Sequence, residues 1–272
     1  MGTEGQTFLA SLSCPSAPHS FSAMRLAVWP VAPARALATA LADLVTDVVE
    51  VEPHEARPAL EAGGVDLALV PTLDVLRAHD GLEVVPGVGL VGERSPRRHL
   101  VVGSALDKIE SIGFDPRDSQ EALLTQLVLR EHYGSQATFA LAPAGTALED
   151  VLAKESAALV DIGVAAPEDA FSLDPALEWL DLTLRPYTWG LVSALAGTVD
   201  PAAARRFQAA ASAAAPTDAL AVDGVGVYQL TLDGYAHDGL DQIAEYLFQT
   251  GTLSEAPAVP FVQIPDGNLE DE

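Results

Sequence analysis

Arg97, Arg98 and His99 stand side by side in a chain that is otherwise strongly acidic, with 14 Lys and Arg residues against 39 Asp and Glu residues. Adjacent guanidinium groups can hold a carboxylate through paired hydrogen bonds. A histidine changes charge near neutral pH and can act as a general base. The segment therefore predicts a site for a small carboxylate with His99 as a catalytic candidate. The alternative is that these cations pair with surface carboxylates of the chain itself.

A second anion site is predicted where a strand leads into a helix within residues 109–134. Asp118 or Ser119 can cap the start of this helix with a side-chain oxygen, and Gly134 stands where a C-terminal glycine is expected. A helix N-terminus offers free backbone N–H groups and the positive end of the helix dipole. Ser119 and Gln120 are therefore candidate ligand contacts. An ordinary strand–helix unit without a ligand remains the alternative.

Two further candidates stand at the ends of buried apolar strands. Thr72 follows the apolar run 65–70, and Asp161 lies near the end of the run 157–162. Open α/β sheets bind ligands at the carboxyl ends of their strands, so Thr72 is a candidate for substrate binding. Asp161 is a candidate general base, with capping of the strand end as the alternative.

Composition limits the classes of partner. The formal net charge of −25 argues against nucleic acid and against anionic membrane surfaces, because both repel such a surface. Cys14 is the only cysteine, so no disulfide framework is expected, and no His, Asp and Glu spacing indicates a metal site. No apolar run reaches transmembrane length. We expect a cytoplasmic protein with a disordered N-terminal arm over residues 1–22 and an acidic tail over residues 263–272.

Strands and helices alternate along the rest of the chain, as in α/β proteins. Strands are expected at 24–29, 47–51, 65–70, 82–90, 99–103, 109–114, 138–141, 157–162 and 186–195, and residues 180–184 are also expected to be extended. Besides the helix that ends at Gly134, helices are expected at 33–44, 54–62, 73–79, 148–154, 201–215 and 238–249. Residues 228–235 fit a strand or a helix. The pattern suits one doubly wound sheet or two lobes with a cleft.

An ordered set of segments resembles the chorismate dehydratase family of the futalosine route to menaquinone. The set is MRLAVW, VDLALVPTLDVLR, SP followed two residues later by HLVVGS, DPRDSQEALLTQLVLREHYG, AALVDIG and RPYTWGLVSAL, and the resemblance extends over about residues 24–250. It implies an α/β, two-lobed, periplasmic-binding-protein-like fold with mixed, mostly parallel sheets and a central cleft. Lobe one would comprise residues 24–103 plus 193–262, and lobe two residues 104–192.

The same resemblance implies a lyase reaction, the dehydration of chorismate to an enolpyruvyl-benzoate, without a metal or an organic cofactor. Carboxylate sites, a base and a donor for the departing hydroxyl are then needed. In the family arrangement Trp29, Tyr187, Thr188 and Trp189 would line the cleft and contact the substrate. Aromatic residues at these positions can instead serve as core or hinge packing.

Some positions depart from the family pattern. Pro30 and Pro33 stand where the family has a serine and an asparagine, and proline has neither a side-chain donor nor a backbone N–H. Two alternatives to the lyase therefore stay open: a non-catalytic protein that binds a small carboxylate, and a degenerate subunit that partners a pathway enzyme. The expected partner is a small-molecule carboxylate, and a homodimer is compatible with the sequence.

Overall fold

The computed structural model describes residues 24–77, 81–103, 105–214, 227–255 and 258–264. The arm expected over 1–22, with Cys14, lies outside the described residues. So does the expected tail beyond residue 264.

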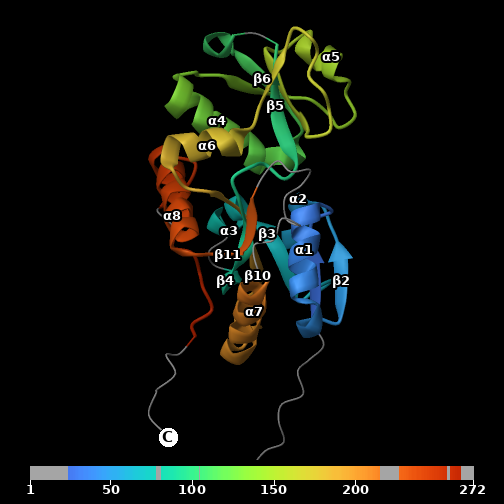
Figure 1. Cartoon of the computed structure of the whole chain (residues 1–272), viewed down its shortest axis with the longest axis vertical. Helices are drawn as coiled ribbons and strands as arrows, with labels where there is room; N and C mark the ends of the chain where they lie inside the picture. Colours follow the sequence, from blue (N-terminus) through green and yellow to red (C-terminus); the bar gives the residue numbers. More distant parts are fainter. Residues whose placement is uncertain (1–23, 78–80, 104, 215–226, 256–257, 265–272) are drawn as a thin grey trace, which may run out of the picture.

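The chain forms two separate β-sheets, each with its own helices (Figure 1). The six-stranded sheet has the order β11-β4-β10-β3-β1-β2, and the five-stranded sheet has the order β7-β6-β8-β5-β9. The six-stranded sheet contains β1 (Arg25–Val28), β2 (Asp47–Glu50), β3 (Leu67–Pro71), β4 (Leu82–Gly92), β10 (Tyr187–Leu195) and β11 (Tyr228–Thr231). The five-stranded sheet contains β5 (Arg98–Val102), β6 (Ser111–Phe114), β7 (Thr138–Leu141), β8 (Ala157–Asp161) and β9 (Phe171–Leu173).

Eight α-helices lie among the described residues. They are α1 (Ala32–Ala40), α2 (Pro53–Glu61), α3 (Thr72–Arg77), α4 (Ser119–Tyr133), α5 (Leu148–Leu152), α6 (Pro175–Thr183), α7 (Pro201–Ala213) and α8 (Gly234–Gln249). Three short 3₁₀ turns are η1 (Ala42–Leu44), η2 (Leu106–Lys108) and η3 (Pro116–Asp118). The alternation of strands and helices confirms the predicted α/β class.

Local sequence explains many of these boundaries. Every residue of β3 is buried, as expected for an apolar run inside a sheet. Helix α7 begins with Pro201 in its first turn, and the Asp200 carboxylate accepts a hydrogen bond from the Ala203 N–H. Helix α4 ends at Gly134, whose φ of 67° lies in the left-handed region that favours glycine.

The expectation that residues 180–184 are extended is wrong, because most of them belong to α6. The signal for this helix lies upstream: Pro175 occupies its first turn, and the Asp174 carboxylate accepts hydrogen bonds from backbone N–H groups of that turn. The undecided segment 228–235 divides into β11 and the first turn of α8.

The chain crosses between the two sheets twice, from β4 to β5 and from α6 to β10. The strand after each crossing joins its sheet antiparallel: β5 pairs with β8 and β9, and β10 pairs with β3 and β4. Both sheets are therefore mixed. The expected lobe boundaries put residues 98–103 in lobe one and 187–192 in lobe two, whereas hydrogen bonding puts β5 in the five-stranded sheet and β10 in the six-stranded sheet.

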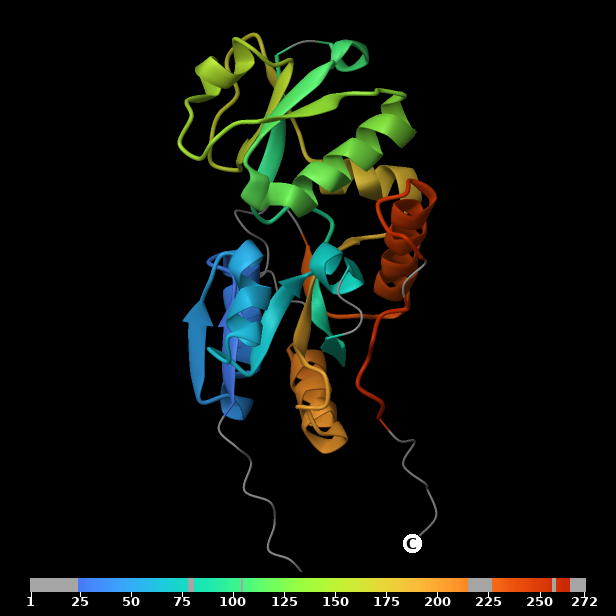
Figure 2. The ribbon, with the colours of Figure 1, turned by 180° about the vertical axis from the view of Figure 1, so that it is seen from behind.

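Helices α4 and α6 lie between the two sheets, on the side of the upper lobe that faces the lower one (Figures 1 and 2). Leu124 and Leu127 of α4 and Trp179 of α6 belong to the same apolar cluster as the core of the six-stranded sheet. Trp179 packs edge-on against Tyr187 and Tyr246, with ring centroids 6.0 and 5.8 Å away. The lobes thus share an apolar core beside the two crossings, which leaves only part of the space between them for a ligand.

Candidate functional site

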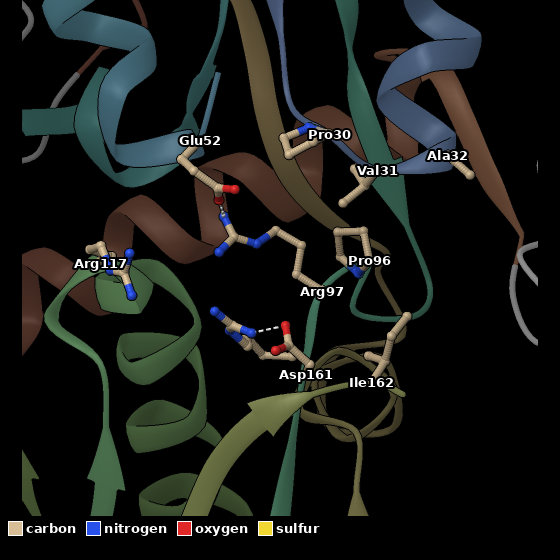
Figure 3. A pocket seen from close by; sticks show the side chains of 10 residues that line it. Pro30, Val31, Ala32, Glu52, Pro96, Arg97, Arg117, Asp161 and Ile162 are labelled. Atoms are coloured by element: carbon tan, nitrogen blue, oxygen red, sulfur yellow. Dashed lines mark hydrogen bonds and ion pairs between the residues drawn. The ribbon is translucent and has the colours of Figure 1, made fainter. Parts of the chain in front are cut away.

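A cavity of about 470 Å³ lies between the lobes, and we call it the interlobe pocket. Its walls are formed by the start of α1, the N-terminus of α2, the residues that lead into β5, and the end of β8 (Figure 3). The lining residues that matter for its chemistry are Pro30, Glu52, Arg97, Arg98, Arg117 and Asp161. Three guanidinium groups thus meet in one pocket of a protein whose net charge is −25.

Asp118 fixes two of these guanidinium groups. Its Oδ1 accepts a hydrogen bond from Arg97 Nη2 at 2.9 Å, and its Oδ2 accepts one from Arg98 Nε at 2.8 Å. The Asp118 side chain is only 2% exposed, and those of Arg97 and Arg98 are 7% and 15% exposed. One carboxylate buried at the start of α4 therefore orients both arginines, and we call these three residues the arginine clamp.

Two further carboxylates, which are more exposed than Asp118, lie beside the arginines of the clamp. Glu52 Oε2 lies 3.7 Å from Arg97 Nη1, and the Asp161 carboxylate accepts a hydrogen bond from Arg98. In Figure 3 the Glu52 side chain points from α2 toward the Arg97 guanidinium, and Asp161 points into the pocket from β8. Arg97 Nη1 is buried and has no hydrogen-bond partner among the described residues. A donor in this state favours an additional acceptor.

Glu121 lies behind the clamp, on the first turn of α4. Its carboxylate is 6% exposed and lies 3.7 Å from Arg97 Nε. Burial raises the pKa of this carboxyl, and the nearby positive charge of Arg97 opposes the rise. Tyr187 is buried close by, and its hydroxyl pKa is raised by burial first and by the Glu121 charge second. Glu121 is thus a carboxyl group whose charged form costs free energy in the folded protein.

Arg117 contributes the third guanidinium group from a more exposed position. Its Nε and Nη2 donate hydrogen bonds to Asp115 at 2.9 and 2.7 Å, and its side chain is 47% exposed. The hydrogen bonds from Arg117 hold the pKa of Asp115 at about 2. This pair forms the solvent-facing rim of the pocket.

A second hollow of about 240 Å³ adjoins the first and shares Arg98, Arg117 and Asp161 with it. Its other walls include residues 142–146, between β7 and α5, and Gly113 of β6. The charged groups therefore stand between two neighbouring spaces. An elongated ligand with two anionic ends has room on both sides of them.

His99 follows the clamp in sequence but not in space. Its side chain is buried, and His99 is absent from the residues that line these two hollows. Successive side chains of a strand point to opposite faces, so Arg98 and His99 of β5 diverge. Burial lowers the pKa of His99, a hydrogen bond with the backbone of Val164 opposes this, and Nε2 has no partner. We therefore leave His99 out of the candidate site.

The predicted aromatic contacts belong to the core. Trp29 and Trp189 are fully buried, and their indole N–H groups donate to the backbone carbonyls of Leu69 at 2.7 Å and Arg94 at 3.0 Å. Tyr187 packs against Trp189 with ring centroids 4.6 Å apart. The packing alternative describes these side chains, because α4 and α6 close over this part of the cleft.

The predicted threonine contacts are buried as well. Thr72 Oγ1 donates to the carbonyl of Thr188 at 2.7 Å, and Thr188 Oγ1 donates to the carbonyl of Ala236 at 3.5 Å. Both hydroxyls thus tie backbone segments together and lie among buried residues. Ser119, at the start of α4, is exposed and does not line the interlobe pocket.

Gln120 links the lobes to each other. Its Oε1 accepts from the N–H of Leu73 at 3.0 Å, and its Nε2 donates to the carbonyl of Trp189 at 2.7 Å. Both partners belong to elements of the six-stranded lobe, whereas Gln120 lies on α4. Both the oxygen and the nitrogen of its amide are thus engaged in this buried connection.

Asp118 does not cap α4 as predicted, since its side chain makes no cap hydrogen bond and binds the two arginines instead. The two buried guanidinium groups attract the Asp118 carboxylate more strongly than neutral backbone N–H groups do. Sequence reasoning found Arg97, Arg98 and Asp161 but missed Glu52, Arg117 and this role of Asp118. The scarcity of basic residues is a signal that draws attention to Arg117.

No group of three or more His, Cys, Asp or Glu side chains is arranged to hold a metal ion within the described ranges. Among those same ranges, none of the helices has both the length and the apolar character needed to cross a bilayer.

Two α/β lobes, two crossings and a pocket between them define a periplasmic-binding-protein-like fold. A solved structure of the protein AF1704 from Archaeoglobus fulgidus is 15% identical, with a TM-score of 0.62, over 86% of this chain and 100% of that chain. The periplasmic aliphatic sulphonate binding protein SsuA from Escherichia coli is 13% identical, with a TM-score of 0.54, over 87% and 95% of the two chains. These likenesses confirm the predicted two-lobed fold with mixed sheets, but the sheets are not mostly parallel, since four strand pairs are parallel and five are antiparallel.

The family model for menaquinone biosynthesis matches residues 24–220, and the chain belongs to this family. The resemblance drawn from the sequence is thereby confirmed, and membership supports a role in menaquinone biosynthesis. No curated protein matches the chain.

Proposed function

We propose that this protein binds a small ring compound with carboxylate groups in the interlobe pocket and dehydrates it, with chorismate as the substrate. One observation carries the proposal: three of the 14 Lys and Arg residues line this single pocket. In a chain with a net charge of −25, such a concentration creates a local site for an anion.

The arginine clamp supplies the binding chemistry. Guanidinium groups bind carboxylates in a planar, two-pronged geometry, and a fixed guanidinium loses little conformational entropy on binding. Asp118 holds Arg97 and Arg98 in place before a ligand arrives. The substrate's carboxylates are then the natural partners of Arg97 and Arg98, with Arg117 at the rim.

Asp161 is the proposed general base. The reaction removes one ring proton and one hydroxyl group, and the electron pair of the broken C–H bond completes the aromatic ring. The proton passes to the Asp161 carboxylate, and the departing hydroxide takes this proton from the Asp161 carboxyl group and leaves as water, which restores the carboxylate. A carboxylate within the pocket satisfies the first requirement of such a base, which is proximity to the ring. The guanidinium groups stabilise the negative charge that develops on the departing oxygen.

Binding without turnover is the second candidate. It is favoured by the position of His99 outside the pocket and by Pro30 on the pocket wall, where no side-chain donor is available. Asp161 would then serve only as a partner of Arg98.

Chorismate turnover separates the two candidates. The full chain is incubated with chorismate at low and high salt, and loss of the diene absorbance is followed. The enzyme proposal predicts turnover that Asp161→Asn lowers by roughly 10²-fold or more. Arg35→Gln is the control, because Arg35 forms an exposed pair with Glu50 away from the pocket, with 2.6 Å between Nε and Oε1.

Thermal stabilisation by chorismate without loss of absorbance would favour the binding candidate. Absence of both effects would overturn the proposed carboxylate site.

A further inference from the structure

The two arginines of the clamp, Arg97 and Arg98, are paired with carboxylates of two kinds, one buried and two exposed. Asp118 is buried and bonded to both guanidinium groups, whereas the Glu52 and Asp161 side chains are 47% and 74% exposed. The buried carboxylate is part of the frame of the site. The exposed carboxylates can be solvated when they rotate away, whereas Arg97 and Arg98 stay buried and then need another negative partner.

The two exposed carboxylates come from different lobes. Glu52 stands at the start of α2 beside the six-stranded sheet, and Asp161 ends β8 of the five-stranded sheet (Figure 3). Each meets one guanidinium group of the clamp: Glu52 meets Arg97, and Asp161 meets Arg98. They therefore occupy the two positions at which an incoming carboxylate would bind.

The pairing of Glu52 with Arg97 is also incomplete. The separation of 3.7 Å between Glu52 Oε2 and Arg97 Nη1 is too long for a hydrogen bond, and Nη1 is buried without a partner. An acceptor that reaches hydrogen-bond distance from Nη1 would satisfy this donor, which Glu52 does not. A ligand carboxylate thus has an advantage over Glu52 at this position.

The charge of the pocket explains why a ligand must displace both exposed carboxylates, Glu52 and Asp161, from the arginines. With Asp115, Asp118, Glu121, Glu52 and Asp161 in place, five carboxylates lie beside the three arginines of the pocket, and an anion meets net repulsion until exposed carboxylates move away. A ligand with one carboxylate can replace only one of the exposed carboxylates, and the other remains beside it. A ligand with two carboxylates replaces both.

We propose that Glu52 and Asp161 are internal competitors of the ligand and that they make the interlobe pocket selective for dicarboxylates. This inference rests on the proposed carboxylate site. It also links binding to the proposed chemistry, because replacement of Asp161 at Arg98 frees that carboxylate to act on the ring.

Calorimetric titration of the full chain tests the inference. The probes are benzoate, with one carboxylate, and benzene-1,3-dicarboxylate, with two. Wild type is expected to bind the dicarboxylate more tightly. Glu52→Gln and Asp161→Asn are each expected to tighten benzoate binding by roughly two- to fivefold, since a weak ion pair no longer competes, and to narrow the difference between the probes.

The substitutions are chosen to leave the fold intact. Glu52 also takes part in a capping box with Glu55 at the start of α2, and glutamine keeps an oxygen that accepts the backbone hydrogen bond. Glu50→Gln is the matched control: it removes one carboxylate of an exposed ion pair with Arg35, outside the pocket, and should leave both affinities unchanged.

The results separate this inference from the proposed function. If wild type binds the dicarboxylate but neither variant binds benzoate more tightly, the competitor role is overturned and the carboxylate site stands. Weaker binding of both probes by the variants would also overturn the competitor role, because it would make these side chains ligand contacts. If wild type and both variants bind neither probe, the carboxylate site fails as well.

Discussion

The buried and the exposed sides of the interlobe pocket both contain ion pairs between aspartate and arginine, but the two sides differ in how strongly solvent screens the charges. On the buried side, Asp118 is 2% exposed and bonds to Arg97 and Arg98. On the exposed side, Asp115 is 13% exposed and bonds to Arg117, whose side chain is 47% exposed and meets solvent. A buried charge without a partner is costly, whereas an exposed one is solvated. The difference indicates that the clamp is a fixed frame and that the rim can exchange its partners.

Asp118→Asn, on the buried side, should lower the stability of the protein more than any other substitution at the pocket or between the lobes. It leaves Arg97 and Arg98 buried with one fixed negative charge fewer, and removal of one partner of a buried pair costs about 3–5 kcal/mol. We expect a free energy of unfolding lower by about that amount, measured by urea denaturation, and weaker carboxylate binding. Asp118→Glu should restore part of the binding because the charge returns.

Asp115→Asn is the matched control on the rim. Its effect at neutral pH should be far smaller, because solvent screens the Arg117 pair. The pKa of Asp115 is lowered from 3.8 to about 2 in the folded state, so its contribution is present above pH 3.8 and is lost as the pH falls toward 2. Equal losses of stability for the two variants would contradict the distinction between clamp and rim.

Gln120→Ala should have the next largest effect. It removes the partners of the Leu73 N–H and the Trp189 carbonyl, both in buried surroundings. Leaving a buried polar group unpaired costs about 1–3 kcal/mol. We expect a loss in this range by urea denaturation. Gln249→Ala, which removes an exposed hydrogen bond to Glu245, should change stability little and serves as the control. A loss no greater than that of the control would mean that Gln120 does not connect the lobes.

Glu121→Gln should have the smallest effect, and its sign depends on pH. The folded-state pKa of Glu121 is raised above its ordinary value of 4.5, mainly by burial. Between these two values the folded protein binds more protons than the unfolded chain, so stability falls as the pH rises. Glutamine resembles the protonated form, so the variant should lose less stability than wild type as the pH rises above 4.5. Parallel pH profiles of unfolding free energy would contradict the raised pKa.

Local chemistry alone determined much of the fold. The apolar run of β3 and Gly134 after α4 act over a few residues, and the structure has them as expected; the cap formed by Asp200 before α7 is equally local. Helix α6 departs from the expected extended segment because apolar residues near its end also suit a strand, whereas its helix signal is the Asp174 cap at its N-terminus. The types of residue at Arg97 and Arg98 also predicted an anion site, and both side chains line the interlobe pocket.

Only the tertiary structure decided which polar groups meet. Asp118 is separated from Arg97 by 21 positions, and both a cap and an ion pair satisfy its local surroundings; burial beside two guanidinium groups selects the ion pair. Tyr187 and Trp189 are suited to a cleft or a core, and the apolar faces of α4 and α6 placed them in the core. Sequence reports the preference of each residue for its neighbours, whereas the choice among distant partners depends on which surfaces pack together and exclude water.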